Sequence, residues 1–296
     1  MRNILILLTG VALLACNQEE PMEKKIENAI NELIEKQPAE IAVALQTKDF
    51  YVGINDTVVM HAASTMKVPV MIEIFRQIEA GKFALQDSLV VRNEFKSIID
   101  GSPYQMDINE DSGDRFYALI GQKASIENLV FDMITFSGNL TTNILIDFVG
   151  AQNVQNTVQN LGVRDLLVLR GVEDIKAFRA GKNNTTTARA LTDLFQAILT
   201  GQAANQPSTA KMIEILLAQS FRDKIPATLP EDAKVAHKTG SITAISHDAG
   251  IIYPPDHDPY VLTVLTRDFE DPEAAKACIA DISAMVYRMV VEREME

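Results

Sequence analysis

Residues 64–69 read Ser-Thr-Met-Lys-Val-Pro and begin an apolar stretch whose periodicity predicts a helix over residues 64–79. A serine hydroxyl is a weak nucleophile at neutral pH, so it needs a base within reach. A residue three positions further on lies on the same helix face, one turn away. We therefore expect Lys67 to reach the hydroxyl of Ser64. The start of the helix also offers backbone N–H groups that suit a developing oxyanion.

The S-x-x-K spacing is weak on its own, because the chain contains it twice. The second copy runs from Ser208 to Lys211, just before an apolar helical pattern over residues 212–217. Serine is a preferred first residue before a helix, where its side chain accepts a backbone N–H bond. We interpret Ser208 as this N-cap and not as a second nucleophile.

Two further motifs distinguish the first copy. Ser137-Gly138-Asn139 is the only S-x-N in the chain and lies between two helical patterns, where it presents a hydroxyl and an amide. Lys238-Thr239-Gly240 is the only K-T-G and lies on a predicted strand. There the lysine offers a positive charge to an anionic group, and the glycine lets a ligand approach the backbone.

In this order the three motifs resemble those of the class A β-lactamases, within the penicillin-recognising serine hydrolases. The resemblance covers nearly all of the chain beyond its amino-terminal segment. It implies that Ser64 is acylated, that Lys67 accepts its proton, and that Ser137 passes a proton to the leaving nitrogen. The residues that it implies for substrate binding are Asn139, Lys238, Thr239, Gly240 and Ser241, with the backbone N–H groups of Ser64 and Ser241 as the oxyanion hole.

Three stretches depart from the family pattern. The motif that usually reads Ser-Asp-Asn has Gly138 at its centre, which removes a carboxylate, and residues 93–124 form a longer stretch than expected. The family loop Arg-x-Glu-x-x-Leu-Asn, whose glutamate activates the deacylating water, is here Arg-Gly-Val-Glu-Asp-Ile-Lys over residues 170–176. Glu173 comes one residue late, and a displacement of about 1 Å can reduce a rate on the order of a hundredfold. Glu173 is therefore either the general base or, with Asp174, part of a surface loop.

These observations predict a serine hydrolase that opens a β-lactam amide through an acyl-Ser64 intermediate. Two alternatives stay open: a related acyl hydrolase, such as a D-alanyl peptidase or an esterase, and a penicillin-binding lipoprotein that deacylates poorly. The expected substrate is accordingly a small β-lactam or an acyl-D-alanyl-like molecule.

Composition excludes several other classes of function. The net charge of −13 argues against nucleic acid as a partner, since that affinity comes from Lys and Arg on phosphates. We find no nucleotide-binding glycine motif, and the four His residues form no zinc motif. We therefore expect neither a cofactor nor a metal.

The amino terminus resembles a bacterial lipoprotein signal peptide. Residues 4–15 form an apolar run that is too short for the roughly 20 residues of a spanning helix. The run ends in Leu13-Leu14-Ala15-Cys16. We expect cleavage after residue 15, lipidation of Cys16, a tether over residues 16–22, and a place in the bacterial cell envelope, facing the periplasm or the cell surface.

The remaining chain, residues 23–296, is expected to form one β-lactamase-like catalytic domain of the α+β class. Strand patterns occur only near its two ends, and helical patterns fill the middle. This order predicts a β-lactamase/transpeptidase-like fold: an antiparallel sheet lobe from residues 23–63 and 206–296, flanked by helices, and an all-helical lobe from residues 64–205. We expect a monomer.

Overall fold

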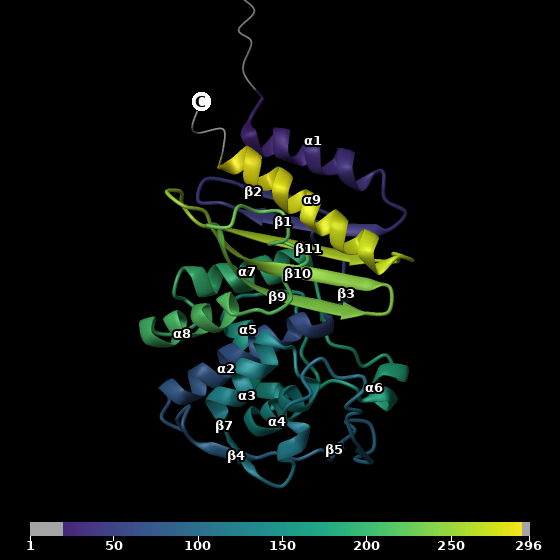
Figure 1. Cartoon of the computed structure of the whole chain (residues 1–296), viewed down its shortest axis with the longest axis vertical. Coiled ribbons are helices and arrows are strands. Elements are labelled where there is room, and N and C mark those ends of the chain that lie inside the picture. Colours follow the sequence, from purple (N-terminus) through teal and green to yellow (C-terminus); the bar gives the residue numbers. More distant parts are fainter. Residues whose placement is uncertain (1–19, 292–296) are drawn as a thin grey trace, which may run out of the picture.

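The structure is a computed structural model that describes residues 20–291; Cys16 and the predicted signal peptide lie outside this range. Its main sheet has five antiparallel strands in the order β2-β1-β11-β10-β9 (Figure 1). The strands come from both ends of the chain: β1 Glu40–Gln46, β2 Tyr51–Ile54, β9 Lys234–Ile242, β10 Ile245–Tyr253 and β11 Tyr260–Arg267. The predicted α+β fold with its antiparallel sheet is confirmed.

Helices cover both faces of this sheet, which explains why its central strands β1, β11 and β10 are buried along nearly their whole length. Helices α1 (Met22–Ile34) and α9 (Pro272–Val290) pack on the outer face, at the top of Figure 1. Helix α7 (Ala188–Leu199) packs on the inner face against β1, β10 and β11. The sequence predicts this helix in the helical lobe; its apolar face contacts the sheet and also belongs to the buried core of the helical lobe.

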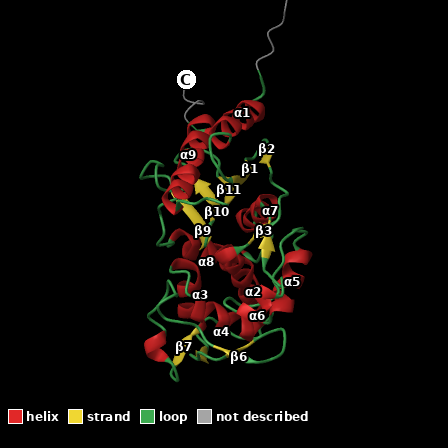
Figure 2. Cartoon of the chain, turned by 90° about the vertical axis from the view of Figure 1, so that its right-hand side faces the viewer, coloured by secondary structure: helices red, strands yellow, loops and turns green. Residues whose placement is uncertain are grey.

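The second lobe lies on the far side of α7 and is mostly helical (Figure 2). Its helices are η1 Ala63–Met66, α2 Lys67–Glu79, η2 Tyr117–Leu119, α3 Ile126–Thr135, α4 Asn139–Val149, α5 Ala151–Asn160 and α6 Ile175–Arg179, with α8 Gln206–Leu217 beside β9. Short two-stranded pairs connect them: β3 Met60–His61 with β8 Thr185–Thr186, β4 Ser88–Val90 with β7 Lys123–Ser125, and β5 Phe95–Lys96 with β6 Pro103–Tyr104.

Two local predictions need correction. Ser64 lies not in the α-helix but in the 3-10 turn η1, and α2 begins only at Lys67. Pro69 therefore falls in the first turn of α2, where its missing N–H costs no helical hydrogen bond. Ser208 is not an N-cap: the side chain of Asn205 caps α8 by accepting the N–H of Ser208 at 3.0 Å.

Within residues 20–291, no helix combines the length and the apolar character that crossing a membrane requires.

The outer core should be sensitive to truncation at the α1 interface. Ile30 is fully buried against the sheet and α9. We expect Ile30→Ala to lower the free energy of unfolding by about 2–5 kcal/mol, because it removes buried methyl groups and leaves a cavity. Thermal or urea denaturation measures the change. Glu32→Ala on the exposed face of α1 is the matched control, with an effect of about 0.5 kcal/mol or less; equal losses in the two variants would contradict this packing.

Candidate active site

The nucleophile turn η1 lies against the edge strand β9. Ala63 has a left-handed φ of 45°, which turns the chain sharply before Ser64. The hydroxyl of Thr65 donates to the backbone oxygen of Ala62 at 2.6 Å and fixes the turn. A Cβ at Gly240 would lie 3.2 Å from the backbone nitrogen of Ser64, so glycine permits this close approach of β9. Ser64 stays partly exposed, as a nucleophile must.

Lys67 projects from the start of α2 into the lobe of helices and is fully buried. Its Nζ donates to the backbone oxygen of Ser137 at 2.6 Å and to Oδ1 of Asn139 at 2.9 Å, and lies 3.2 Å from Oγ of Ser137. Among the described residues, its hydrogen-bond partners are thus Ser137 and Asn139 and not the expected Ser64 hydroxyl. Burial lowers the pKa of Lys67 from 10.5 to about 8, which provides a neutral amine near physiological pH.

A second buried lysine reaches the same serine from the sheet. Lys238 Nζ donates to Oγ of Ser137 at 3.1 Å and to the backbone oxygen of Thr239 at 2.8 Å. Burial, together with the positive charge of Lys67, holds the pKa of Lys238 well below its usual value. Ser137 has a left-handed φ of 59°. Its hydroxyl carries one proton and two lone pairs, so it can accept from one amine and donate to the other.

A third lysine, which the sequence analysis missed, lies beside the K-T-G strand. Lys224 is 2 % exposed, and its Nζ donates to Oγ of Ser241 at 2.9 Å and to the backbone oxygen of His247 at 3.2 Å. No pattern in the sequence identified it, because it lies in an irregular segment between α8 and β9. It orients the Ser241 hydroxyl and adds positive potential where a carboxylate is expected to bind.

The carboxylate of Glu173 reaches the site in spite of its late position. Its Oε1 accepts a hydrogen bond from Nδ2 of Asn139 at 2.8 Å, so Asn139 connects Glu173 to Lys67. Glu173 has a left-handed φ of 61°, a strained conformation for this residue that turns its side chain toward Asn139. It is half-buried, and burial raises its pKa. The surface-loop interpretation of Glu173 is not what the structure shows.

Buried amides hold the loop that carries Glu173. Asn143 accepts the N–H of Val172 at 2.7 Å and donates to its backbone oxygen at 3.0 Å. Asn184 binds the backbone of Arg170 in the same way. Asp174 is buried, caps α6, and accepts bonds from the hydroxyl of Ser97 and the N–H of Ile98. It is therefore an anchor between two loops.

Comparisons with known proteins agree with this geometry. A β-lactamase from Streptomyces albus G is 31% identical over 53% of this chain and 51% of its own length, so the match spans about half of that relative. A β-lactamase from Rhodobacter capsulatus is 24% identical over 77% of this chain and 75% of its own length.

Solved structures match over nearly the whole described chain. The structure of a β-lactamase from Sphaerobacter thermophilus has a TM-score of 0.77 and 27% identity, covering 90% of this chain and 97% of that one. The structure of PBP-A has a TM-score of 0.77 and 26% identity, covering 92% and 97%. The family model described as the β-lactamase enzyme family matches residues 25–290. The chain therefore belongs to the β-lactamase enzyme family.

Proposed function

We propose that this protein hydrolyses β-lactams through an acyl-Ser64 intermediate and that Glu173 is the base that completes turnover. The observation that carries the proposal is the continuous set of contacts from Lys238 through Ser137 and Lys67 to Asn139 and Glu173. It provides groups for both half-reactions, acylation and deacylation. The curated relatives from Streptomyces albus G and Rhodobacter capsulatus are themselves called β-lactamases.

Acylation begins when Oγ of Ser64 attacks the carbonyl carbon of the lactam and its proton passes to the neutral amine of Lys67. The backbone N–H groups of Ser64 and Ser241 stabilise the oxyanion. The C–N bond then breaks: Ser137 gives its proton to the lactam nitrogen and regains one from Lys67 across their 3.2 Å contact. Substrate-free sites often show longer catalytic contacts, so the missing Ser64–Lys67 bond is compatible with this step.

Substrate binding uses the positive side of the site. Lys238, with the Thr239 hydroxyl, receives the substrate's carboxylate, and the buried charge of Lys224 reinforces this attraction. Asn139 binds the side-chain amide of the substrate. In deacylation, Glu173 takes a proton from water as the water oxygen attacks the ester carbon of Ser64. As the C–O bond breaks, that proton passes to Oγ of Ser64, which restores the Glu173 carboxylate.

Glu173→Gln should separate the two half-reactions. The amide keeps an acceptor for Asn139 but cannot take a proton, so we expect acylation to persist while deacylation slows by about 100-fold or more. Intact-protein mass spectrometry with a penicillin, alongside a chromogenic cephalosporin assay, should show a lasting adduct on Ser64. Ser64→Ala should form no adduct.

The matched control is Glu110→Gln, a neighbouring exposed carboxylate, which should turn over at the wild-type rate. Normal turnover by Glu173→Gln would exclude Glu173 as the base. A persistent adduct on the wild-type protein would instead favour a penicillin-binding protein with poor deacylation. No adduct would favour a hydrolase of other acyl substrates.

Acylation should depend on the protonation of Lys67. The amine accepts a proton only when neutral, and its pKa is about 8, so the acylation rate constant should rise with pH and level off above pH 8. Two pH units below this pKa, at pH 6, about 1% of the amine is neutral. The acylation rate constant should then be about a hundredfold lower than its plateau value at high pH. Stopped-flow measurement in Glu173→Gln isolates this step. A constant rate between pH 6 and pH 9 would exclude neutral Lys67 as proton acceptor.

We further propose that the protein is exported to the bacterial cell envelope, anchored there by lipid on Cys16, and active as a monomer. The apolar run before Cys16 supports the anchor. The described end of the chain also supports it, because α1 begins at the end of the sheet lobe that is farthest from the helical lobe (Figure 1).

The anchor is tested in the bacterium. Wild-type protein should partition into the detergent phase of Triton X-114 and incorporate a labelled fatty acid, whereas Cys16→Ser should do neither. Cys278→Ser is the matched control and should behave as wild type, because that thiol is buried in α9. Equal labelling of wild type and Cys16→Ser would contradict the anchor. Light scattering of the soluble domain gives the oligomeric state.

A further inference from the structure

The turn Ser137-Gly138-Asn139 contains a glycine that its backbone does not require. Gly138 has φ −55° and ψ 125°, which any residue adopts readily. The left-handed residue of this turn is Ser137. A reason other than conformational freedom must therefore explain glycine at this position.

The reason is that the structure leaves no space for a side chain at position 138. A Cβ built on Gly138 would lie 2.1 Å from Oδ2 of Asp132 and 2.6 Å from Oγ1 of Thr141. The long stretch over residues 93–124 packs against the same point, since a Cβ on Gly113 would lie 2.7 Å from Cα of Gly138. The carboxylate of Asp132, near the end of α3, thus fills the volume that a side chain at position 138 would occupy.

This carboxylate is fully buried and has defined partners. Oδ2 of Asp132 accepts a hydrogen bond from the hydroxyl of Thr141 at 2.9 Å, and Oδ1 accepts from Nε of Arg115 at 3.0 Å. Its backbone oxygen also accepts the N–H of Gly138 at 3.3 Å. Asp132 therefore contacts both the turn and the first helical turn of α4 that follows it.

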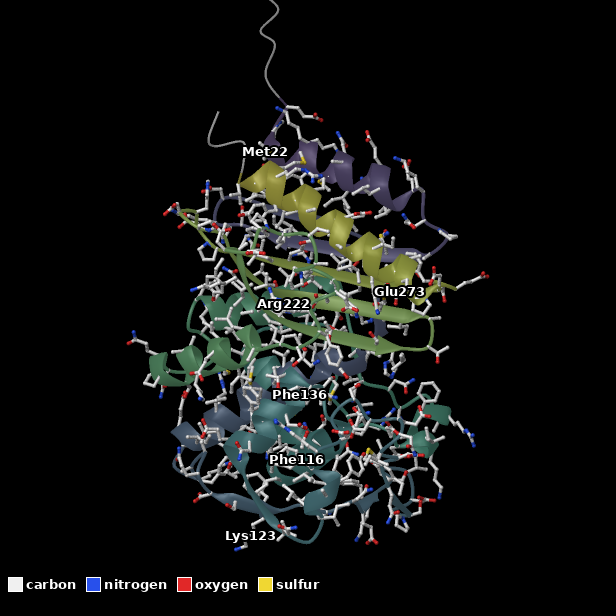
Figure 3. All side chains as sticks on the ribbon, viewed as in Figure 1. Met22, Phe116, Lys123, Phe136, Arg222 and Glu273 are labelled. Atoms are coloured by element: carbon white, nitrogen blue, oxygen red, sulfur yellow. The ribbon has the colours of Figure 1, made fainter. Side chains whose placement is uncertain are left out.

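Aromatic rings hold Arg115 in place over the carboxylate. Its guanidinium carbon lies 4.6 Å from the ring centre of Phe136 and 5.6 Å from that of Phe116. Both rings lie in the helical lobe, below the sheet (Figure 3). Phe136 directly precedes Ser137, so the arginine connects the carboxylate to the residue that leads into the catalytic turn.

We propose that Asp132 is a positioning residue for Ser137 and Asn139, and that Asp132 and Gly138 form a complementary pair. The overlap of atoms allows the carboxylate beside this turn to come from position 132 or from position 138, but not from both. The proposal rests on the proposed function for the roles of Ser137 and Asn139. The geometry of the pair does not depend on it.

The test is a cycle of four proteins: wild type, Asp132→Ala, Gly138→Asp, and the double variant. We expect Asp132→Ala to lower the acylation rate constant at least tenfold, because Ser137 is no longer held at the lysines. Gly138→Asp should lower it further and reduce the unfolding temperature, because two carboxylates compete for one space. The double variant should recover to within about threefold of wild type.

Stability and activity are measured together, at a temperature well below the unfolding of every variant. Asp132→Asn keeps the shape and the bond from Thr141, so it should retain more of the acylation rate than Asp132→Ala. The matched control is Asp147→Ala: Asp147 lies on α4 and pairs with Arg92 at 2.8 Å, but it is exposed. That variant should leave the acylation rate unchanged.

Three results would overturn the proposal. Additive losses in the double variant would show that the two positions are not complementary, and wild-type acylation by Asp132→Ala would show that it positions nothing. If wild type itself forms no adduct with a penicillin, the proposed function fails, but the coupling between Asp132 and Gly138 can still be measured. Unfolding temperatures then report the coupling, and a crystal structure of Asp132→Ala with an unmoved Ser137 would refute the positioning role.

Discussion

The burial of two lysine amines around one serine hydroxyl is the constraint on which the site depends. Lys67 comes from the helical lobe and Lys238 from the sheet, and both contact Oγ of Ser137. A buried ammonium is costly, so each amine needs several oxygen partners or gives up its proton. Lys238 also joins the two lobes, because its amine donates both to Thr239 on the sheet and to Ser137 in the helical lobe. Catalytic chemistry and lobe packing thus share one set of contacts.

The second half-reaction depends on backbone conformation more than on side-chain spacing. Glu173 arrives one residue later than the family pattern, yet its left-handed φ turns the carboxylate back to Asn139. That conformation is unfavourable for glutamate and persists because Asn143 holds Val172 and Asp174 is fixed at the start of α6. Strained residues of this kind concentrate at functional sites. The loop therefore brings a carboxylate to Asn139 although its sequence register differs from the family pattern.

The sequence predicted the α+β fold and the strands near the two ends of the chain, since apolar periodicity and turn residues are local signals. It missed what depends on distant contacts. Lys224 reaches Ser241 from an irregular segment, and Asp132 fills the space beside Gly138 from α3. Apolar periodicity predicts an α-helix at Ser64, because a 3-10 turn and an α-helix bury side chains at similar spacings. Glu173 stayed ambiguous because spacing along a chain does not reveal the sign of φ.

The outer layer has a further consequence for the ends of the chain. Met22 at the start of α1 and Val290 at the end of α9 line the same surface pocket, beside Phe50 and Tyr260. The described chain therefore begins and ends at neighbouring points, on the face of the sheet that is turned away from α7 and the helical lobe (Figure 1). A short peptide across this gap would close the domain into a ring. New termini opened in a remote surface loop would then give a circularly permuted enzyme whose catalytic groups keep their places.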